Sequence, residues 1–338
     1  MRAGPRLTRR GLATTALLAL TSRARADDAQ PVFFRIATGS VSGTYYPVGG
    51  LIATIVSRPP GAPPCAPDGP CGVEGLVAVV QSSDGSVSNV ASIQSGAVES
   101  GFAQSDVAYW AYRGEGAFAG KPPMTKLRVL GSLYPESVHL VVRPDAGIAH
   151  ITDLKHKRVS LDRPGSGTRV DAELVLAAAG LGAADLDVLD TPPGRNVDLM
   201  KAGDLDAFFL VAGYPVAAIT ELATDIGARL VPIDGPELQA LRDRQPFFGS
   251  AVIPAGTYPG VGATATAAVQ AQWLVSADEP DALVTAICGS LWRQGAEKVL
   301  DAGHPKGREI RLASAIEGIA VPLHPGAEAF YRERGLLR

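Results

Sequence analysis

The segment VFFRIATGSVSGTYYPVGG (Val32–Gly50) begins with an apolar run and continues through a turn rich in glycine and hydroxyl side chains. The apolar run Val32–Ala37 predicts a strand, and the helical spacing of apolar residues in Gly49–Val56 predicts a helix behind the turn. The strands expected next, Val73–Ser83 and Ser100–Gln104, are also followed by a polar turn and a helix. This repeated order indicates a parallel α/β sheet.

The same order begins again after residue 145, which indicates a second α/β unit. Between the two units, Leu127–Leu133 and Val138–Val142 are expected as two separate strands. The strands and helices expected in the second unit are Arg158–Leu161, Arg169–Ala179, Asp206–Val211 and Val216–Ala223.

The chain has 338 residues, and a single hydrophobic core stops growing at roughly 250–300 residues, so this length suggests two packed units. We expect lobe 1 to consist of residues 27–143 and 248–338, and lobe 2 to consist of residues 144–247. The sequence thus predicts a bilobed protein.

The composition is that of a folded globular protein, with 46% apolar and 19% charged residues. The 31 Lys and Arg residues are balanced by 34 Asp and Glu residues and form no basic run. This argues against a nucleic-acid-binding protein, which carries a basic stripe. Beyond the N-terminus no apolar stretch reaches the roughly 18 residues of a membrane helix, so no membrane span is expected.

The first 26 residues contain six arginines and no acidic residue, and the apolar run Leu12–Leu20 follows Arg9 and Arg10. Ala24-Arg25-Ala26 supplies a small–x–small cleavage site, so we expect a signal peptide cleaved after Ala26 and a periplasmic protein. Thr8–Leu12 fits the twin-arginine pattern, which favours Tat export over an ordinary Sec signal. The mature protein would have 25 basic and 34 acidic residues, a net charge of −9.

Two of the three cysteines, Cys65 and Cys71, lie six residues apart in a loop rich in proline and glycine. In an oxidising compartment such a pair can close a disulfide. A metal-binding pair is the alternative, although no second Cys or His pair has a matching spacing. Cys288 lies in an apolar helical stretch and is expected to be a buried thiol.

Sequence signatures of catalysis are missing. The chain has no G-x-S-x-G elbow, no G-x-G-x-x-G fingerprint and no H-E-x-x-H motif. The five histidines show no ligand spacing, and His139, in a predicted strand close to Glu136, is interpreted as a core or hinge residue. We therefore expect neither an enzyme nor a cofactor or metal.

Four polar turns are expected after strands and before helices, which is where ligands bind in open α/β sheets. Each helix start supplies unpaired backbone N–H groups and a partial positive charge of roughly half a unit, which favours an anion. A Ser or Thr at such a place can also be an ordinary helix cap, so one turn alone decides little. The four turns are Ser42–Tyr45, Ser83–Ser86, Gln104–Asp106 and Gly165–Thr168.

With these turns, the chain resembles the TAXI family of solute receptors, the extracytoplasmic binding subunits of TRAP-type transporters. It departs from the family at Ser42-Gly43, where a pair of glycines is common, and at the insertion that holds Cys65 and Cys71. The matching segments, in family order, are Gly43–Gly49 (GTYYPVG), Gly85–Val90 (GSVSNV), Gly101–Ala108 (GFAQSDVA), Leu133–Glu136 (LYPE), Pro164–Thr168 (PGSGT), Asp206–Phe209 (DAFF), Gly213–Pro215 (GYP), Ile253–Tyr258 (IPAGTY) and Pro322–Ala327 (PLHPGA).

The resemblance implies an α/β type II periplasmic-binding-protein fold, in which two α/β lobes close around a ligand cleft. It implies a monomeric receptor that captures a small carboxylate, such as glutamate, 2-oxoglutarate or a dicarboxylate, and delivers it to the membrane permease subunits of a TRAP transporter. The residues expected to bind the ligand are Gly43, Thr44, Tyr45, Ser86, Gln104, Ser166, Gly167, Thr168 and Tyr214.

Two other functions stay open. An enzyme on the same scaffold would need a base and a nucleophile within hydrogen-bond reach of each other. A sensory binding protein would use the fold without a transporter. Two residues also keep a second interpretation, since Tyr214 could simply pack beside Pro215, and Glu136 could pair with an amino group or serve the hinge.

Overall fold

The computed structural model describes Met1, residues 30–67 and residues 69–337. The signal peptide expected at residues 1–26 lies outside the described residues apart from Met1. Among the described residues no helix is long and apolar enough to cross a membrane.

The N-terminal part of the chain alternates strands and helices, as the sequence predicts. The strand expected at Val73–Ser83 is divided into two, because Gly75 adopts a φ of 80° that ends one strand before the next begins. The elements in chain order are β1 (Val32–Ala37), α1 (Tyr45–Val56), β2 (Ser57–Arg58), β3 (Val73–Glu74), β4 (Leu76–Gln81), α2 (Ser86–Ser95), β5 (Ser100–Gln104), α3 (Ser105–Arg113), η1 (Gly116–Phe118) and β6 (Leu127–Val142).

The middle of the chain repeats this alternation and adds two elements that the sequence pattern did not predict, α7 and β11. The elements in this part are η2 (Ile151–Leu154), β7 (Arg158–Ser160), α4 (Gly167–Ala178), η3 (Ala183–Asp185), β8 (Asp187–Leu189), α5 (Pro193–Ala202), β9 (Ala207–Ala212), α6 (Ala217–Ile226), β10 (Arg229–Val231), α7 (Gly235–Arg244) and β11 (Gly249–Ile253).

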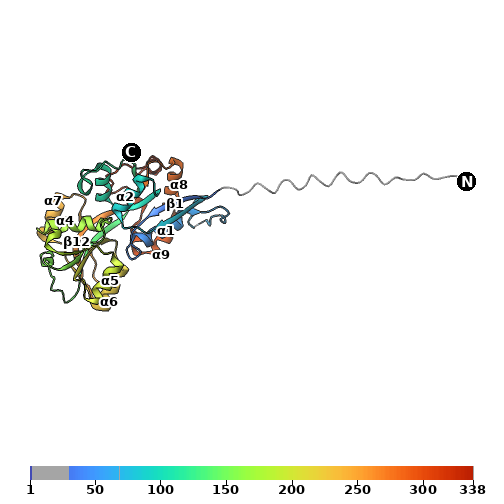
Figure 1. The fold of residues 1–338 in the computed structure, drawn as a ribbon. Coiled ribbons are helices and arrows are strands. Elements are labelled where there is room, and N and C mark those ends of the chain that lie inside the picture. The colour runs from blue at the N-terminus through green and yellow to red at the C-terminus, as the bar shows by residue number, and fades with distance from the viewer. Residues whose placement is uncertain (2–29, 68, 338) are drawn as a thin grey trace.

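The last part of the chain returns through one long strand and then is mostly helical. Its elements are β12 (Thr264–Ser276), α8 (Asp281–Leu291), α9 (Gln294–Gly303), η4 (Pro305–Glu309), η5 (Leu312–Ser314) and α10 (Pro325–Glu333). In the assembled molecule α2 and α8 lie at one end, whereas α5 and α6 lie at the other (Figure 1).

The main sheet has the strand order β4-β1-β5-β12-β6-β9-β7-β8. In one half β1 runs parallel to β4 and β5, and β12 joins β5 in the antiparallel direction. In the other half β7 runs parallel to β8 and β9, and β6 joins β9 in the antiparallel direction. The two halves therefore share one arrangement, each completed by a strand from elsewhere in the chain, and this is the two-lobed α/β fold that the resemblance implies.

β6 is one continuous strand that includes both segments. The prediction of two separate strands at Leu127–Leu133 and Val138–Val142 is therefore wrong. Pro135 pairs with Gln270 next to a register shift between β6 and β12. A bulge tolerates a residue without an N–H group, which explains why a proline motif interrupts the pattern without ending the strand. β6 and β12 thus connect the lobes side by side.

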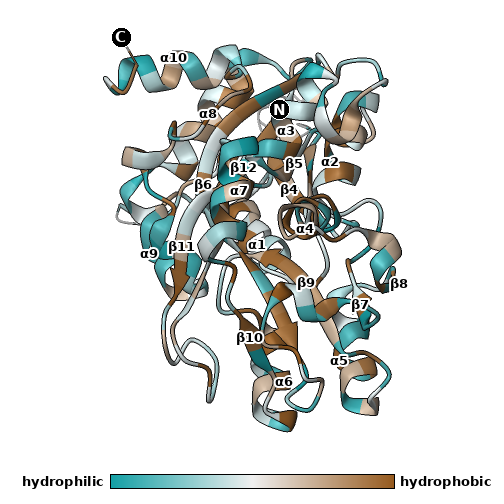
Figure 2. Cartoon of the chain, turned by 90° about the vertical axis from the view of Figure 1, so that its left-hand side faces the viewer, coloured by the Kyte–Doolittle hydropathy of each residue, from teal (hydrophilic) through white to brown (hydrophobic). Residues whose placement is uncertain are grey.

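Separate hydrophobic cores lie on the two sides of this crossing. In lobe 1 the fully buried Trp273 packs edge-on against Phe34 and Phe102, with ring centroids 6.4 and 6.2 Å apart. In lobe 2 the strand β9 is buried along its whole length, as a strand covered on both faces should be (Figure 2). Phe248 and Val269 pack in the core of lobe 2. We therefore propose that the chain returns to lobe 1 within β12, later than the boundary expected at residue 248.

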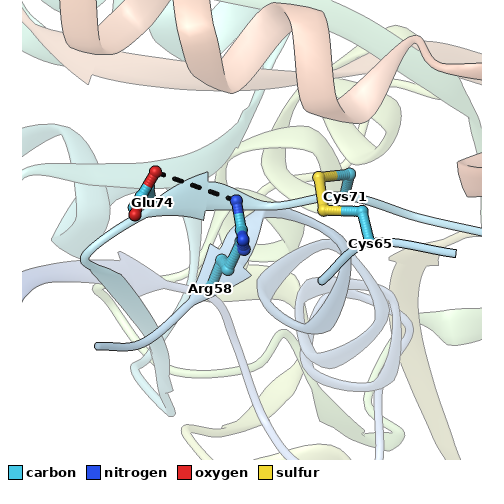
Figure 3. The surroundings of a disulfide bond; sticks show 4 residues. All are labelled: Arg58, Cys65, Cys71 and Glu74. Carbon is cyan, nitrogen blue, oxygen red and sulfur yellow. Dashed lines mark ion pairs between the residues drawn. A yellow bond between two sulfur atoms is a disulfide. The ribbon is translucent and has the colours of Figure 1, made fainter. Parts of the chain in front are cut away.

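Cys65 and Cys71 form a disulfide with a Cα–Cα distance of 5.4 Å, which confirms the expected bridge (Figure 3). Beside it, Arg58 of β2 and Glu74 of β3 form an ion pair of 3.8 Å. The bridged loop packs on the start of α9, where a side chain on Gly295 would lie 2.3 Å from the backbone of Gly69. The disulfide therefore holds this loop against lobe 1.

Replacing both Cys65 and Cys71 by serine is expected to lower the free energy of unfolding by about 2 kcal/mol, the loop-closure entropy of so short a ring. Urea unfolding of the variant and the wild-type protein measures this difference. The buried Cys288 supplies an internal control, because it should react with iodoacetamide only after unfolding. Three alkylated cysteines in unreduced, unfolded protein would contradict the bridge.

Candidate ligand-binding site

A cavity of about 270 Å³ lies between the lobes, at the carboxyl ends of the strands of both halves. Eight of the nine residues expected to bind ligand line it, namely Gly43, Thr44, Tyr45, Ser86, Gln104, Ser166, Gly167 and Thr168. These residues come from separate turns in the sequence, and the sheet brings the turns together because parallel strands end at the same edge. Their roles toward a ligand stay predictions.

The lobe 1 turns are tied to one another by Asn89 of α2. Its amide donates hydrogen bonds to the backbone oxygens of Thr38 at 2.6 Å and of Phe102 at 2.7 Å. Ser83 donates to the Asn89 side-chain oxygen at 2.7 Å. Asn89 thus connects the segments that follow β1 and β4 with β5, which places the starts of α1 and α2 at the cavity. The motif GSVSNV contains this residue, but its connecting role was visible only in the structure.

The lobe 1 wall contains a buried acid. The Tyr45 hydroxyl donates to Glu136 Oε2 at 2.6 Å, and the Glu136 side chain is 1% exposed. Burial raises the pKa of Glu136 to about 8, against the opposing effects of Tyr45 and of the Lys306 ammonium. Glu136 is therefore mostly protonated at neutral pH in this closed structure, and its carboxyl can donate or accept a hydrogen bond at the cavity.

The lobe 2 wall is built around Asp162, which the sequence interpretation did not select. Ser166 Oγ donates to Asp162 Oδ2 at 2.8 Å, and the Arg163 N–H donates to Asp162 Oδ1 at 2.8 Å. Asp162 adopts a φ of 68°, in the left-handed region that non-glycine residues seldom enter. Burial raises its pKa to about 6. Its position directly after a strand, like that of the predicted turns, is the sequence signal that could have identified it.

Thr168 holds β9 as well as the cavity wall, because its hydroxyl oxygen accepts a hydrogen bond from the Val211 N–H at 3.0 Å. Replacing Thr168 by valine is expected to weaken binding of a carboxylate by roughly 1–3 kcal/mol, since a buried donor then loses its partner. Isothermal titration calorimetry measures the change, and Thr224→Val on the exposed side of α6 is the control. An affinity equal to that of the wild-type protein would remove Thr168 from the site.

Among the described helices that begin at the cavity, α1, α2 and α4 start without a side-chain cap and next to residues expected to bind ligand. Within the described part of the chain, Thr44, Gly85 and Ser166 precede α1, α2 and α4 and make no side-chain hydrogen bond to the first turn. The Thr44 hydroxyl donates instead to the backbone oxygen of Gly213, and Ser166 donates to Asp162. The N–H groups and partial positive charges of these helix starts are therefore directed at the cavity, where they suit an anionic group.

The lobes touch each other around the cavity, so the structure is a closed form. The Ser88 N–H donates to the backbone oxygen of Gly165 at 3.0 Å, and the Arg163 guanidinium pairs with Asp84 at 2.5 Å. Gly167 allows the closest approach, because a Cβ atom there would lie 1.5 Å from Gln104 Oε1.

Tyr214 does not line the cavity, which leaves its predicted ligand contact without support from the geometry. It precedes a cis peptide bond to Pro215, and its ring lies under the Lys306 ammonium at 4.0 Å. Lys306 is buried and also pairs with Glu309 at 2.9 Å. Tyr214 therefore packs in its turn and against the end of lobe 1, as the second interpretation of this residue held.

His139 is a core histidine of lobe 2. Its Nδ1 lies 2.9 Å from the backbone oxygen of Ser137, and its Nε2 lies 3.0 Å from the Tyr258 hydroxyl. Burial lowers the pKa of His139 to about 4, so the ring stays neutral. It does not line the cavity.

The ionisable residues of the cavity wall are mostly acidic. Among the described residues that line it, Asp84, Glu136 and Asp162 are acidic, and Arg163 is the one basic residue. In the same part of the chain, no three His, Cys, Asp or Glu side chains are arranged to hold a metal ion.

Several solved structures are similar to this chain. PhnD1 from Prochlorococcus marinus (MIT 9301), in complex with methylphosphonate, is 11% identical, with a TM-score of 0.51 over 90% of this chain and 98% of that one. The alkanesulfonate-binding protein SsuA from Xanthomonas axonopodis pv. citri, bound to MOPS, is 18% identical, with a TM-score of 0.45 over 91% and 92% of the two chains. The likeness to PhnD1 shows a shared two-lobed fold.

A family model adds a relationship in sequence. The model of the NMT1-like family matches residues 36–335, which include all the turns that line the cavity. The match spans both lobes and both crossing strands, so it covers the complete fold rather than one motif. The chain belongs to the NMT1-like family.

Proposed function

We propose that this protein is a periplasmic solute-binding protein that captures a small carboxylate by lobe closure and delivers it to the membrane permease of a TRAP-type (TAXI) transporter. The observation that carries the proposal is the cavity lined by turns of both lobes, with the uncapped starts of α1, α2 and α4 around it. A ligand that contacts both walls binds the closed form better than the open one and so drives closure.

The cavity wall favours a ligand that carries an ammonium group as well as a carboxylate. The starts of α1, α2 and α4 suit the carboxylate, whereas Asp162, whose pKa is about 6 and which is therefore mostly ionised at neutral pH, suits a cation. A dianion would face Asp162 with Arg163 as the one basic residue of the described cavity lining, and Arg163 is already paired with Asp84. Glutamate therefore fits the site better than 2-oxoglutarate or a simple dicarboxylate.

The type of transporter is supported by the sequence segments alone. The nine segments that resemble TAXI receptors occur in family order through both lobes, including the turns at the cavity. The expected N-terminal signal supports a periplasmic location. Uptake of labelled solute by cells with and without the gene for this protein, and by cells in which TRAP permease genes of the same genome are deleted in turn, tests the partner.

The ligand is tested with a thermal-shift panel of L-glutamate, 2-oxoglutarate and succinate, followed by calorimetry. At a concentration 100 times Kd, a ligand stabilises the protein by about 2.7 kcal/mol. We expect L-glutamate to raise Tm and the two dicarboxylates to have little effect. If succinate bound as tightly as L-glutamate, the proposed ammonium group of the ligand would be contradicted. If no member of a wider carboxylate panel bound, the proposed carboxylate ligand would be contradicted.

An enzyme on the same scaffold is the alternative, and the Ser166–Asp162 hydrogen bond is the observation in its favour. In the described structure His139 is turned away into the lobe 2 core, so no histidine activates Ser166. Mass spectrometry of each ligand after incubation with the protein separates the two functions. A ligand recovered unchanged supports the receptor. A product that forms with the wild-type protein but not with Ser166→Ala would instead indicate a hydrolase or a lyase.

A further inference from the structure

Two acids from opposite lobes meet behind the cavity. Asp106 is in the first turn of α3 in lobe 1, and Asp171 is in α4 in lobe 2. Both side chains are 0% exposed, and neither lines the cavity. Contact between them requires the closed arrangement of the lobes, because α3 and α4 are attached to different halves of the sheet.

Both carboxyl groups are fully buried, and within the described residues no side-chain donor reaches either oxygen of Asp106 or Oδ1 of Asp171. Gln104 Nε2, from lobe 1, donates to Asp171 Oδ2 at 2.7 Å and fixes the orientation of that carboxyl. Two carboxyl groups buried together in this way can share a hydrogen bond only if one of them is protonated and donates to the other. Among the described side chains, no cationic group hydrogen-bonds Asp106 or Asp171. The pair therefore has no cation to balance two negative charges.

The charged groups around Asp106 and Asp171 also favour a protonated carboxyl in the pair. Glu136 of β6 is the further titratable group that interacts electrostatically with both acids, and it disfavours their ionisation. The charged side chains on the elements packed against α3 and α4 lie elsewhere, since Arg113 pairs with Glu115, and Arg169 pairs with Glu173 and Asp190. On α7 the side chains of Arg242, Asp243 and Arg244 are exposed.

We propose that closure of the two lobes takes up one proton, which Asp106 and Asp171 share in the closed form and release when the lobes open. This inference rests on the lobe closure of the proposed function, but it does not depend on which solute binds. When the lobes separate, both carboxyls meet water and ionise independently, as exposed aspartates do.

The direction of the effect follows from this difference in proton binding. Burial raises the pKa of Asp171 well above its ordinary value, and the Asp106 carboxyl raises it further. The closed form is therefore favoured at low pH, and this preference is lost as pH rises from the ordinary aspartate range toward the pKa of the closed pair. Each unit of pH in that window changes the ratio of closed to open protein by up to about tenfold.

Distances between two spin labels, measured by pulsed EPR on the ligand-free full chain from pH 5 to pH 8, test the proposal. The labels are attached to cysteines introduced at Ser95 in α2 and Thr224 in α6, exposed positions in different lobes. Cys288 is buried and does not compete. We expect the short-distance population to grow as pH falls.

Asp106→Asn should remove this pH dependence, because an asparagine amide donates to an ionised Asp171 without a proton from solution. Asp198→Asn, a surface substitution on α5, is the matched control and should behave as the wild-type protein does. Glu136→Gln measures how much the neighbouring Glu136 carboxyl contributes to the pH dependence of closure. If Asp106→Asn fails to fold by circular dichroism, Asp171→Asn takes its place.

A population that does not change with pH, or that changes equally in Asp106→Asn and the wild-type protein, would overturn the proposal. The ligand screen can fail on its own without altering these distances, and this separates the two hypotheses. A pH-dependent closure in a protein that binds no carboxylate would support the proton pair and contradict the proposed carboxylate ligand.

Discussion

Alanine at position 167 is expected to weaken ligand binding by roughly 100-fold while each lobe folds as before, since an added methyl group in a packed contact costs about 1–3 kcal/mol. The new Cβ atom would lie 1.5 Å from Gln104 Oε1 and 2.7 Å from Ser86 Oγ. Gln104 cannot easily move away, because it is buried and bonded to Asp171 and Ser86. Both contacts are between lobes, so the substitution penalises the closed form and not the folding of either lobe.

Calorimetry with L-glutamate and small-angle scattering of the same samples measure this effect. The scattering should show a protein that stays open when ligand is added. Gly289→Ala is the matched control, because a Cβ atom at this position in α8 would meet nothing within 4 Å. It should bind as the wild-type protein does and be slightly more stable, since alanine favours a helix over glycine. A Gly167→Ala protein that closes and binds normally would contradict the close contact of Gly167 with Gln104 as a requirement for closure.

Glutamine at position 136 is expected to stabilise the protein by a few kcal/mol at pH 8 and to have little effect at pH 5. Burial raises the pKa of Glu136 to about 8, so the folded protein binds this proton more tightly than the unfolded chain, whose glutamate titrates near 4.3. The free energy of unfolding therefore falls as pH rises from about 4 through 8. In this range the unfolded chain gives up the proton of Glu136 easily, whereas the folded protein must either keep the proton or bury a charged carboxylate. The glutamine amide does not titrate, and its oxygen can still accept the Tyr45 hydrogen bond.

Urea unfolding of the wild-type protein and Glu136→Gln at several pH values between 5 and 8 measures the difference. Glu297→Gln, at an exposed position in the first turn of α9, is the control and should show no such growth with pH. The pair of Asp106 and Asp171 contributes a dependence of the same sign, so the variant should retain part of the slope. Stability curves that stay parallel across the pH range would show that Glu136 is solvated at the cavity.

Local chemistry was enough to predict most of the cavity. Turns such as PGSGT and the segment from Ser42 to Tyr45 combine glycine, hydroxyl groups and a following helix, and parallel strands bring such turns to one edge of the sheet. Tyr214 fitted the same description but lies outside the cavity, because its turn packs against Lys306 from the C-terminal part of the chain. A contact between residues so distant in sequence leaves no local pattern.

The acids of the site could not be predicted in the same way. Asp162 reads as one more polar residue after a strand, and Asp171 as one of the charged residues of a helix. The burial of Asp171 depends on which face of α4 meets lobe 1, and that of Asp162 on the wall of the cavity in which it lies, and both are set by the packing of the lobes. Asp106 and Asp171 are 65 positions apart in the chain, and only closure of the lobes buries their carboxyl groups together.

The sequence itself determined most of the order of strands and helices, the close spacing of the cysteine pair and the residues of the polar turns at the cavity. Each of these features depends on residues close together in the chain. The tertiary structure alone decided three features: the path of β6 and β12 between the lobes, the acidic character of the cavity, and the burial of Asp106 beside Asp171. The physical reason is that burial changes what a carboxyl group does, and burial is a property of the packed lobes rather than of any segment.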